Sequence, residues 1–183
     1  MIRPLLTAFA LFAAVASPSR AEDAKPAELK VGAFTFKVAA PWEARKEKKA
    51  MSAGGFTLPG KDGAASIEAD FYHFGSGQGG GVEPNLQRWQ KQFLPDTQGN
   101  PAPMTREEIT VSGQKALLVT ITGTFLSGPA MSAKKTPMRD YAMVGAILQS
   151  PEGDVFLKVT GPQAATLAQK DSIKQIITAA LTK

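Results

Sequence analysis

Apolar and polar residues alternate along several short segments of this chain, and this period of two constrains its fold more than any other feature. Residues 33–38 (AFTFKV) and 65–74 (ASIEADFYHF) both follow the pattern. Segments 108–111 and 115–125 flank Ser112-Gly113, a dipeptide typical of a two-residue β-hairpin turn. Strands joined by such short turns must be antiparallel neighbours. The sequence therefore predicts an antiparallel sheet.

The remaining segments complete an α+β fold. Further strands are predicted at residues 56–58, 141–149 and 154–160. Apolar residues at helical spacing predict one helix from about 83 to 94 and a second that starts at Gly161-Pro162. Amphipathic helices need an apolar face to cover. We therefore expect an antiparallel sheet of about six or seven strands covered by helices, an α/β/α sandwich.

The beginning of the chain has the three parts of a secretory signal peptide, predicted at residues 1–21. Arg3 supplies the positive start, residues 5–15 form the apolar stretch, and Ser19-Arg20-Ala21 is a small-residue cleavage site. An apolar stretch of about 11 residues is too short to span a bilayer, which takes about 20. We predict cleavage after Ala21, with Ala16 as the alternative site.

Cleavage at this position would leave a flexible tether at residues 22–30 and one globular domain at residues 31–183. A domain of this length can bury an adequate hydrophobic core. No integral membrane segment is expected once the signal peptide is removed. The expected compartment is the periplasm, with secretion to the exterior as the alternative.

Composition excludes several classes of function. The chain has no cysteine, so it can form no disulfide, thiolate nucleophile or zinc–thiolate site. Its one histidine cannot build a histidine-based metal cluster. The formal net charge of +5 includes two arginines of the predicted signal peptide, so the mature chain is only mildly basic. This charge suits small anionic ligands or acidic partners and does not indicate nucleic-acid binding.

Three local patterns resemble the PsbP-like group, which comprises photosystem-II extrinsic proteins, a nuclear-import Ran-binding protein and bacterial DcrB-type envelope proteins. They are the opening strand that leads to Pro41-Trp42, the mid-chain helix with Asn85, Arg88, Trp89 and Phe93, and residues 156–162 before the last helix. The resemblance covers nearly all of residues 31–182 and implies an α/β/α sandwich. Members of this group are mostly binding or accessory proteins, which implies a protein that is not an enzyme and needs no cofactor.

A small-ligand pocket is one hypothesis for the middle of the chain. His73 ends an apolar strand face, Tyr72 precedes it, and the glycine-rich loop from Gly75 to Gly81 follows. Ser76 and Gln78 are the polar side chains of this loop, which leads into a helix N-terminus, where backbone N–H groups favour anions. The simpler interpretation is a structural histidine beside a flexible connection.

Basic residues gather in two predicted connections. The first group is Arg45, Lys46, Lys48 and Lys49, and the second is Lys134, Lys135 and Arg139. If the connections meet at one end of the sheet, they would form a cationic patch for an anionic headgroup, a polysaccharide or an acidic protein. Ordinary solubilising charge is the alternative. Segment 127–139 is long and poor in core residues, so it is a candidate partner surface.

Glu68 and Asp70 point the same way on the strand at residues 65–74, about 7 Å apart. Two such carboxylates could contribute to a calcium site or to unfamiliar carboxylate chemistry. A solvated sheet face, or one paired with lysines, explains them more simply, and no metal site is expected.

From these patterns we expect an exported, non-enzymatic accessory or binding domain that contacts another component of the cell envelope. The alternative is a small-ligand or ion-binding protein with its pocket near His73 and the loop from Gly75 to Gly81.

Overall fold

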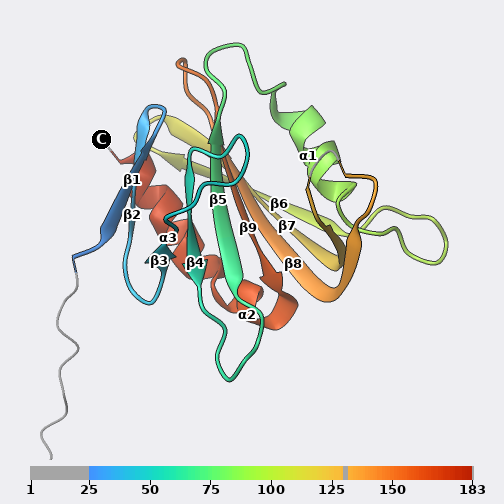
Figure 1. The fold of residues 1–183 in the computed structure, drawn as a ribbon. Helices are drawn as coiled ribbons and strands as arrows, with labels where there is room; N and C mark the ends of the chain where they lie inside the picture. The colour runs from blue at the N-terminus through green and yellow to red at the C-terminus, as the bar shows by residue number, and fades with distance from the viewer. Residues whose placement is uncertain (1–24, 130–131, 183) are drawn as a thin grey trace, which may run out of the picture.

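The structure, a computed structural model, describes residues 25–129 and 132–182 (Figure 1). The predicted signal peptide and the first residues of the predicted tether lie outside this part of the chain. None of the helices in the described ranges is long and apolar enough to cross a membrane.

A seven-stranded antiparallel sheet forms the centre of the molecule, with the strand order β3-β4-β5-β9-β8-β7-β6. A separate two-stranded hairpin, β1–β2, lies beside it (Figure 1). The strands are β1 (Ala27–Val31), β2 (Phe34–Val38), β3 (Glu43–Ala44), β4 (Gly54–Leu58), β5 (Ile67–His73), β6 (Met104–Val111), β7 (Gln114–Ser127), β8 (Thr136–Leu148) and β9 (Val155–Pro162). This arrangement confirms the predicted α+β antiparallel sheet.

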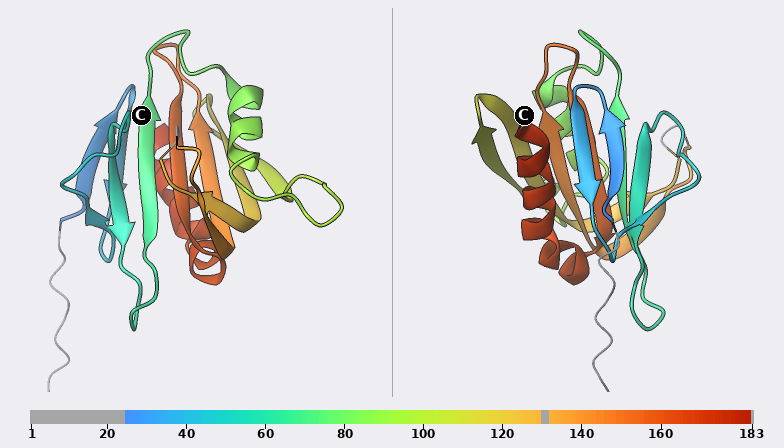
Figure 2. Two further views of the ribbon diagram at one scale, coloured as in Figure 1. Left: turned by 45° about the vertical axis from the view of Figure 1, so that its right-hand side comes forward. Right: turned by 90° about the vertical axis from the view of Figure 1, so that its left-hand side faces the viewer.

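Helices lie on both sides of the sheet (Figure 2). We call the side of Ile67 and Phe71 face A, and the side of Glu68 and Tyr72 face B. The hairpin β1–β2 and two consecutive helices, α2 (Gln163–Ala168) and α3 (Lys170–Leu181), cover face A. Helix α1 (Val82–Gln90) packs on face B. The α/β/α sandwich therefore has a complete layer on face A and one short helix on face B.

Each face carries its own apolar core. On face A the rings of Phe36 and Phe71 lie 4.5 Å apart between centroids, which ties the hairpin β1–β2 to the sheet. On face B the buried Trp89 of α1 packs over β7 and β8. Gly145 of β8 allows this contact, because a Cβ there would lie 2.8 Å from Trp89 Cε3. The position of α1 is thus fixed over one half of the sheet.

Two predicted boundaries at the start and middle of the chain are wrong. The tether at 22–30 contains β1, whose residues pair with β2 through a turn at Gly32, where φ is +54°. The helix predicted to continue to residue 94 ends at Gln90. Its next residues pair with β7 instead: Leu94 N–H donates to the Thr124 carbonyl over 2.9 Å, and Leu126 N–H donates to the Gln92 carbonyl over 2.7 Å.

Two boundaries in the second half also differ from prediction. The loop expected at 128–137 ends earlier, because β8 starts at Thr136, which pairs with Ser127 of β7. The last helix starts after Pro162 and is divided at Gln169. The division follows from packing, since α2 contacts β8 and β9 whereas α3 contacts β2. Sequence analysis placed the start of β8 too late because Pro137, a residue typical of turns, is the second residue of the strand.

Candidate functional site

Helix α1 covers only part of face B, and the rest of that face carries polar side chains. Along β5 and β9 two connections project from the sheet in place of a helix (Figures 1 and 2). One is residues 45–53 between β3 and β4, which we call the β3–β4 connection. The other is the end of the β7–β8 hairpin, of which the structure describes residues 122–129 and 132–140; we call these residues the β7–β8 arm. Both carry basic residues, so this part of face B is the candidate site.

Asp70 of β5 is the most buried charged group of the site, with 5% of its surface exposed. Its carboxylate accepts hydrogen bonds from the Arg45 guanidinium and from Lys49 Nζ, the latter over 2.9 Å. Gly55 makes room for this guanidinium, because a Cβ at Gly55 would overlap it. Glu68 lies further out, with Arg45 Nη1 at 3.7 Å and an ion pair to Lys49.

These pairs correct the expectation of a solvated carboxylate face. Asp70 is buried, and the alternative of a face paired with lysines holds through Lys49, with Arg45 added. Both carboxylates are engaged by cations, which leaves neither available as a free general base. Among the described residues, no three or more His, Asp or Glu side chains are grouped so that they could hold a metal ion.

Lys158 of β9 lies directly opposite Asp70 in the β5–β9 ladder. Its Nζ donates a hydrogen bond to Gln92 Oε1 over 2.7 Å. Burial, together with the positive charges of Lys49 and Lys135, lowers the pKa of Lys158 to about 8 against the opposing effect of Asp70. Lys158 is therefore near a basic residue of each connection.

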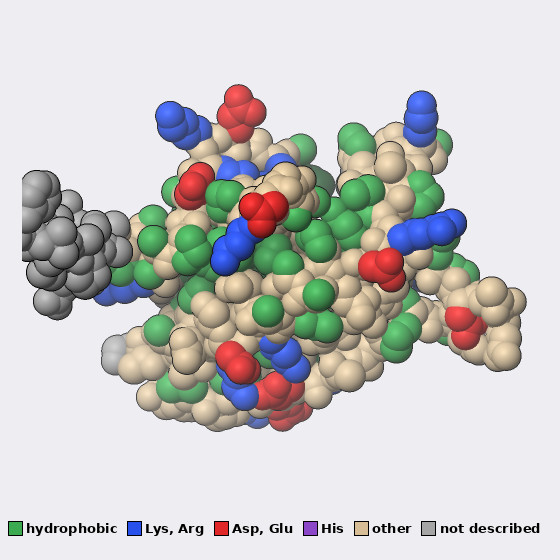
Figure 3. Space-filling view, turned by 90° about the horizontal axis from the view of Figure 1, so that it is seen from below, with side chains coloured by type: hydrophobic (Ala, Val, Ile, Leu, Met, Phe, Trp, Pro, Cys, Tyr) green, Lys and Arg blue, Asp and Glu red, His purple; other side chains and the backbone are tan. Residues whose placement is uncertain are grey.

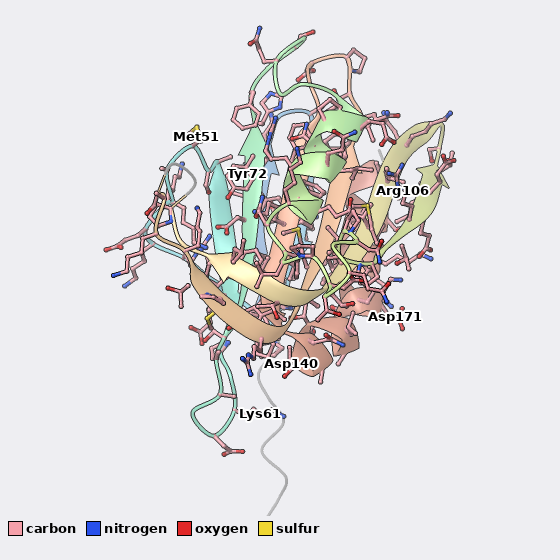
Figure 4. All side chains as sticks on the ribbon, turned by 90° about the vertical axis from the view of Figure 1, so that its right-hand side faces the viewer. Met51, Lys61, Tyr72, Arg106, Asp140 and Asp171 are labelled. Carbon is pink, nitrogen blue, oxygen red and sulfur yellow. The ribbon has the colours of Figure 1, made fainter. Side chains whose placement is uncertain are left out.

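Tyr72 follows Asp70 on the same face of β5 (Figure 4). Burial and the negative charge of Asp70 together raise the pKa of Tyr72 to about 12. The phenol therefore keeps its proton even in mildly alkaline solution and can act as a hydrogen-bond donor. Its ring stacks on Phe74, with centroids 6.5 Å apart, and Phe74 is 40% exposed.

The β7–β8 arm bends over face B at a register shift between Gly123 and Phe125. Phe125 holds the bend in place, with its ring 5.3 Å from Phe93 and stacked 6.2 Å from Tyr141. Lys135 near its tip donates to the carbonyls of its own loop, Gly128 at 3.5 Å and Pro129. Seen from below, hydrophobic side chains gather in a hollow between two projections that both carry Lys or Arg (Figure 3).

The predicted pocket around His73 is not assembled. His73 and Tyr72 are successive strand residues and so point to opposite faces of the sheet. The His73 ring packs on the β1–β2 turn, where a Cβ at Gly32 would lie 3.0 Å from its Cε1. Its Nδ1 lies 3.3 Å from the Asp154 carbonyl oxygen. These contacts match the simpler interpretation of a structural histidine.

The loop residues Ser76 and Gln78 are exposed, and they follow β5 at the end of the sheet away from the β4–β5 turn. This loop is anchored by the buried Asn85, whose Nδ2 donates to the carbonyls of Gly79 and Gly81, both over 2.6 Å. The glycine-rich segment therefore serves to enter α1, and it lies away from the charged residues of β5 and β9.

One lysine of each basic group lies near the polar part of face B. Lys49 of the first group and Lys135 of the second both lower the pKa of Lys158 through their positive charge. Lys46 and Lys48 on one side and Lys134 and Arg139 on the other are exposed. The structure thus brings together Tyr72, Lys135 and the basic connections, and it separates them from His73, Ser76 and Gln78.

Sequence analysis missed two members of the site, Lys158 and Gln92. A signal for Lys158 exists, because this lysine interrupts an apolar run in a strand that lies in the middle of the sheet. The sequence gives no comparable signal for Gln92. Its contact with Lys158 depends on how the residues after α1 pair with β7.

No protein-family model matches the chain, and no curated protein matches it in sequence. Among solved structures it is similar to the cyanobacterial PsbP protein (CyanoP) of Synechocystis sp., with a TM-score of 0.52 and 11% identity over 90% of this chain and 96% of that one. It is also similar to a protein of unknown function from Pseudomonas aeruginosa, with a TM-score of 0.49 and 13% identity over 85% of this chain and 95% of the other. The chain therefore has a PsbP-like fold, as its sequence patterns predicted, and this likeness concerns the fold alone.

Proposed function

We propose that this protein is an exported, non-enzymatic binding module that contacts an anionic component of the cell envelope through the open part of face B. One observation carries the proposal: the part of the sheet that no helix covers holds a half-buried charged cluster between two basic connections. Export rests on the signal peptide predicted from the sequence.

The charges of this surface favour an anionic partner. Lys46 and Lys48 of the β3–β4 connection and Lys134 and Arg139 of the β7–β8 arm are exposed. Like charges on two neighbouring projections raise the local positive potential, which speeds encounters with an anionic surface and selects against cationic ones. Exposed connections on a rigid sheet are also where binding residues are most often found.

The same geometry argues for binding in preference to catalysis. The carboxylates of the site are held by Arg45 and Lys49, and Tyr72 retains its proton at neutral pH. A hydrolytic or proton-transfer site needs a free base next to a nucleophile. The groups present instead supply hydrogen-bond donors and positive charge, which are the features of a recognition surface.

A matched pair of charge variants tests this proposal. A photo-crosslinking residue replaces Met51, which is 71% exposed at the edge of the site (Figure 4). We expect an adduct with an envelope component that is lost at high salt, because exposed charges are screened within about 10 Å at 0.1 M salt. K134E/R139E should abolish the adduct, whereas K30E/K115E, with the same change in net charge, should preserve it. Equal adducts from both variants would show that the open part of face B is not the contact surface.

A further inference from the structure

Lys158 poses a charge-balance problem at the centre of the site. This lysine belongs to a central strand, is half-buried, and donates one hydrogen bond, to the neutral amide of Gln92. The carboxylate opposite it, Asp70, already accepts hydrogen bonds from Arg45 and Lys49. Within residues 25–129 and 132–182, no ion pair to Lys158 is present.

A half-buried ammonium without a close ion pair is costly, because its desolvation is only partly repaid. The negative charge of Asp70 offsets part of this cost, whereas the positive charges of Lys49 and Lys135 add to it. An external anion at this point would supply the missing negative charge.

The donors available here suit a tetrahedral oxyanion. Lys158 has further N–H donors beyond the one given to Gln92, and Lys135, whose amine donates to carbonyls of its own loop, adds positive charge nearby. A planar carboxylate is best matched by the fork of an arginine, but the Arg45 guanidinium is engaged by Asp70. Lysine ammonium groups act as point charges and bind phosphate from several directions.

We propose that Lys158 forms the base of a subsite for a phosphate or phosphoryl group, bound between the β3–β4 connection and the β7–β8 arm. This inference rests on the proposed function and specifies the anionic group that the surface recognises. The groups that face the Lys158 ammonium are Asp70 of β5, Lys49 of the β3–β4 connection, Lys135 of the arm and Gln92 after α1.

The test is NMR titration of the purified full chain with inorganic phosphate, observing the ε-CH2 signals of Lys158. We expect saturable shifts of this signal and a higher Lys158 pKa when phosphate is bound, because an anion that prefers the charged amine must raise its proton affinity in return. Lys158→Met should weaken phosphate binding at least tenfold, whereas Lys115→Met, at an exposed lysine, should leave it unchanged. The titration of the unmodified protein needs no variant to fold.

Further ligands separate the sources of the group. Binding of both phosphate and glycerol 3-phosphate supports a phosphoryl group carried on a larger molecule, and binding of inorganic phosphate alone supports the free ion. Acetate binding as tightly as phosphate, or phosphate binding unaffected by Lys158→Met, would overturn the subsite. A crosslinked envelope adduct without phosphate binding overturns this inference alone. Phosphate binding without that adduct overturns the proposed function and leaves the subsite.

Discussion

The lysine at the centre of face B should make the stability of this protein depend on pH in an unusual direction. Lys158 has a pKa of about 8 in the folded protein against an ordinary value of 10.5. Between these two values the unfolded chain binds more protons than the folded one, so the free energy of unfolding rises with pH. A lysine that gained an ion pair on folding would give the opposite slope.

The size of the effect follows from the two pKa values. One unit of pKa difference corresponds to about 1.4 kcal/mol. In the unfolded chain the Lys158 amine is still mostly protonated at pH 10, so the full difference between the two pKa values is not yet reached. We therefore expect Lys158 to add about 2–3 kcal/mol to the free energy of unfolding between pH 7 and pH 10. Above pH 10 the effect of Tyr72 has the opposite sign, because its raised pKa keeps the phenol protonated in the folded state.

Urea unfolding at pH 7 and pH 10, in buffers free of phosphate, measures this effect for the unmodified chain and for Lys158→Met. Methionine removes the titrating amine, so the stability gap between the two proteins should change by about 2–3 kcal/mol across this interval. Any effect of the methionine on packing is the same at both pH values, so it does not contribute to the change in the gap. Lys115→Met, at an exposed lysine, should show no such change. If the gap for Lys158→Met stays constant, Lys158 is not a desolvated cation and the argument fails.

Three further predictions concern the packing of the sheet and its charged residues. Asp70→Ala should cost about 3 kcal/mol of unfolding free energy, because the half-buried Arg45 keeps only the more distant Glu68, whereas Glu68→Ala, at a side chain 43% exposed, should cost less than about 1 kcal/mol. Gly145→Ala should destabilise the protein by about 1–3 kcal/mol through overlap with Trp89, and combining it with Trp89→Leu should cost less than the sum of the two changes. His73→Ala should lower the melting temperature by removing packing on the β1–β2 turn and leave phosphate affinity unchanged; lost affinity would instead restore a ligand role for this histidine.

Local periodicity was sufficient to predict most of the sheet. The alternation in β2 and β5 identified their buried sides correctly, because a half-buried strand needs one apolar and one polar face. Ser112-Gly113 identified the β6–β7 turn, where both residues have positive φ (+52° and +78°). Strand β1 was missed because Leu29 and Val31 alternate over only five residues among charged neighbours.

The candidate site depends on contacts that periodicity does not encode. Asp70 lies on the polar side of its strand, and its burial results from Arg45, 25 positions earlier, folding over it. Lys158 donates its hydrogen bond to Gln92, which lies 66 positions away in the sequence. Sequence analysis found the charged residue types of the two connections. It could not decide which of them meet, because that depends on the bend of the β7–β8 arm.

The uneven covering of the sheet explains why charge is placed where it is. Face A is covered by α2, α3 and the β1–β2 hairpin, and a large cluster of buried apolar residues fills the space between them. On face B the described residues include one short helix, α1, which with Phe93 and Ala102 packs on β7, on β8 and on Phe156 of β9. Beyond that contact an apolar sheet surface would be exposed to water, so the chain places ionic groups there and covers them with two polar connections. A PsbP-like sheet can therefore keep its core on face A unchanged while the residues of these connections determine what face B binds, and substitutions that alter binding without altering stability should fall in the connections.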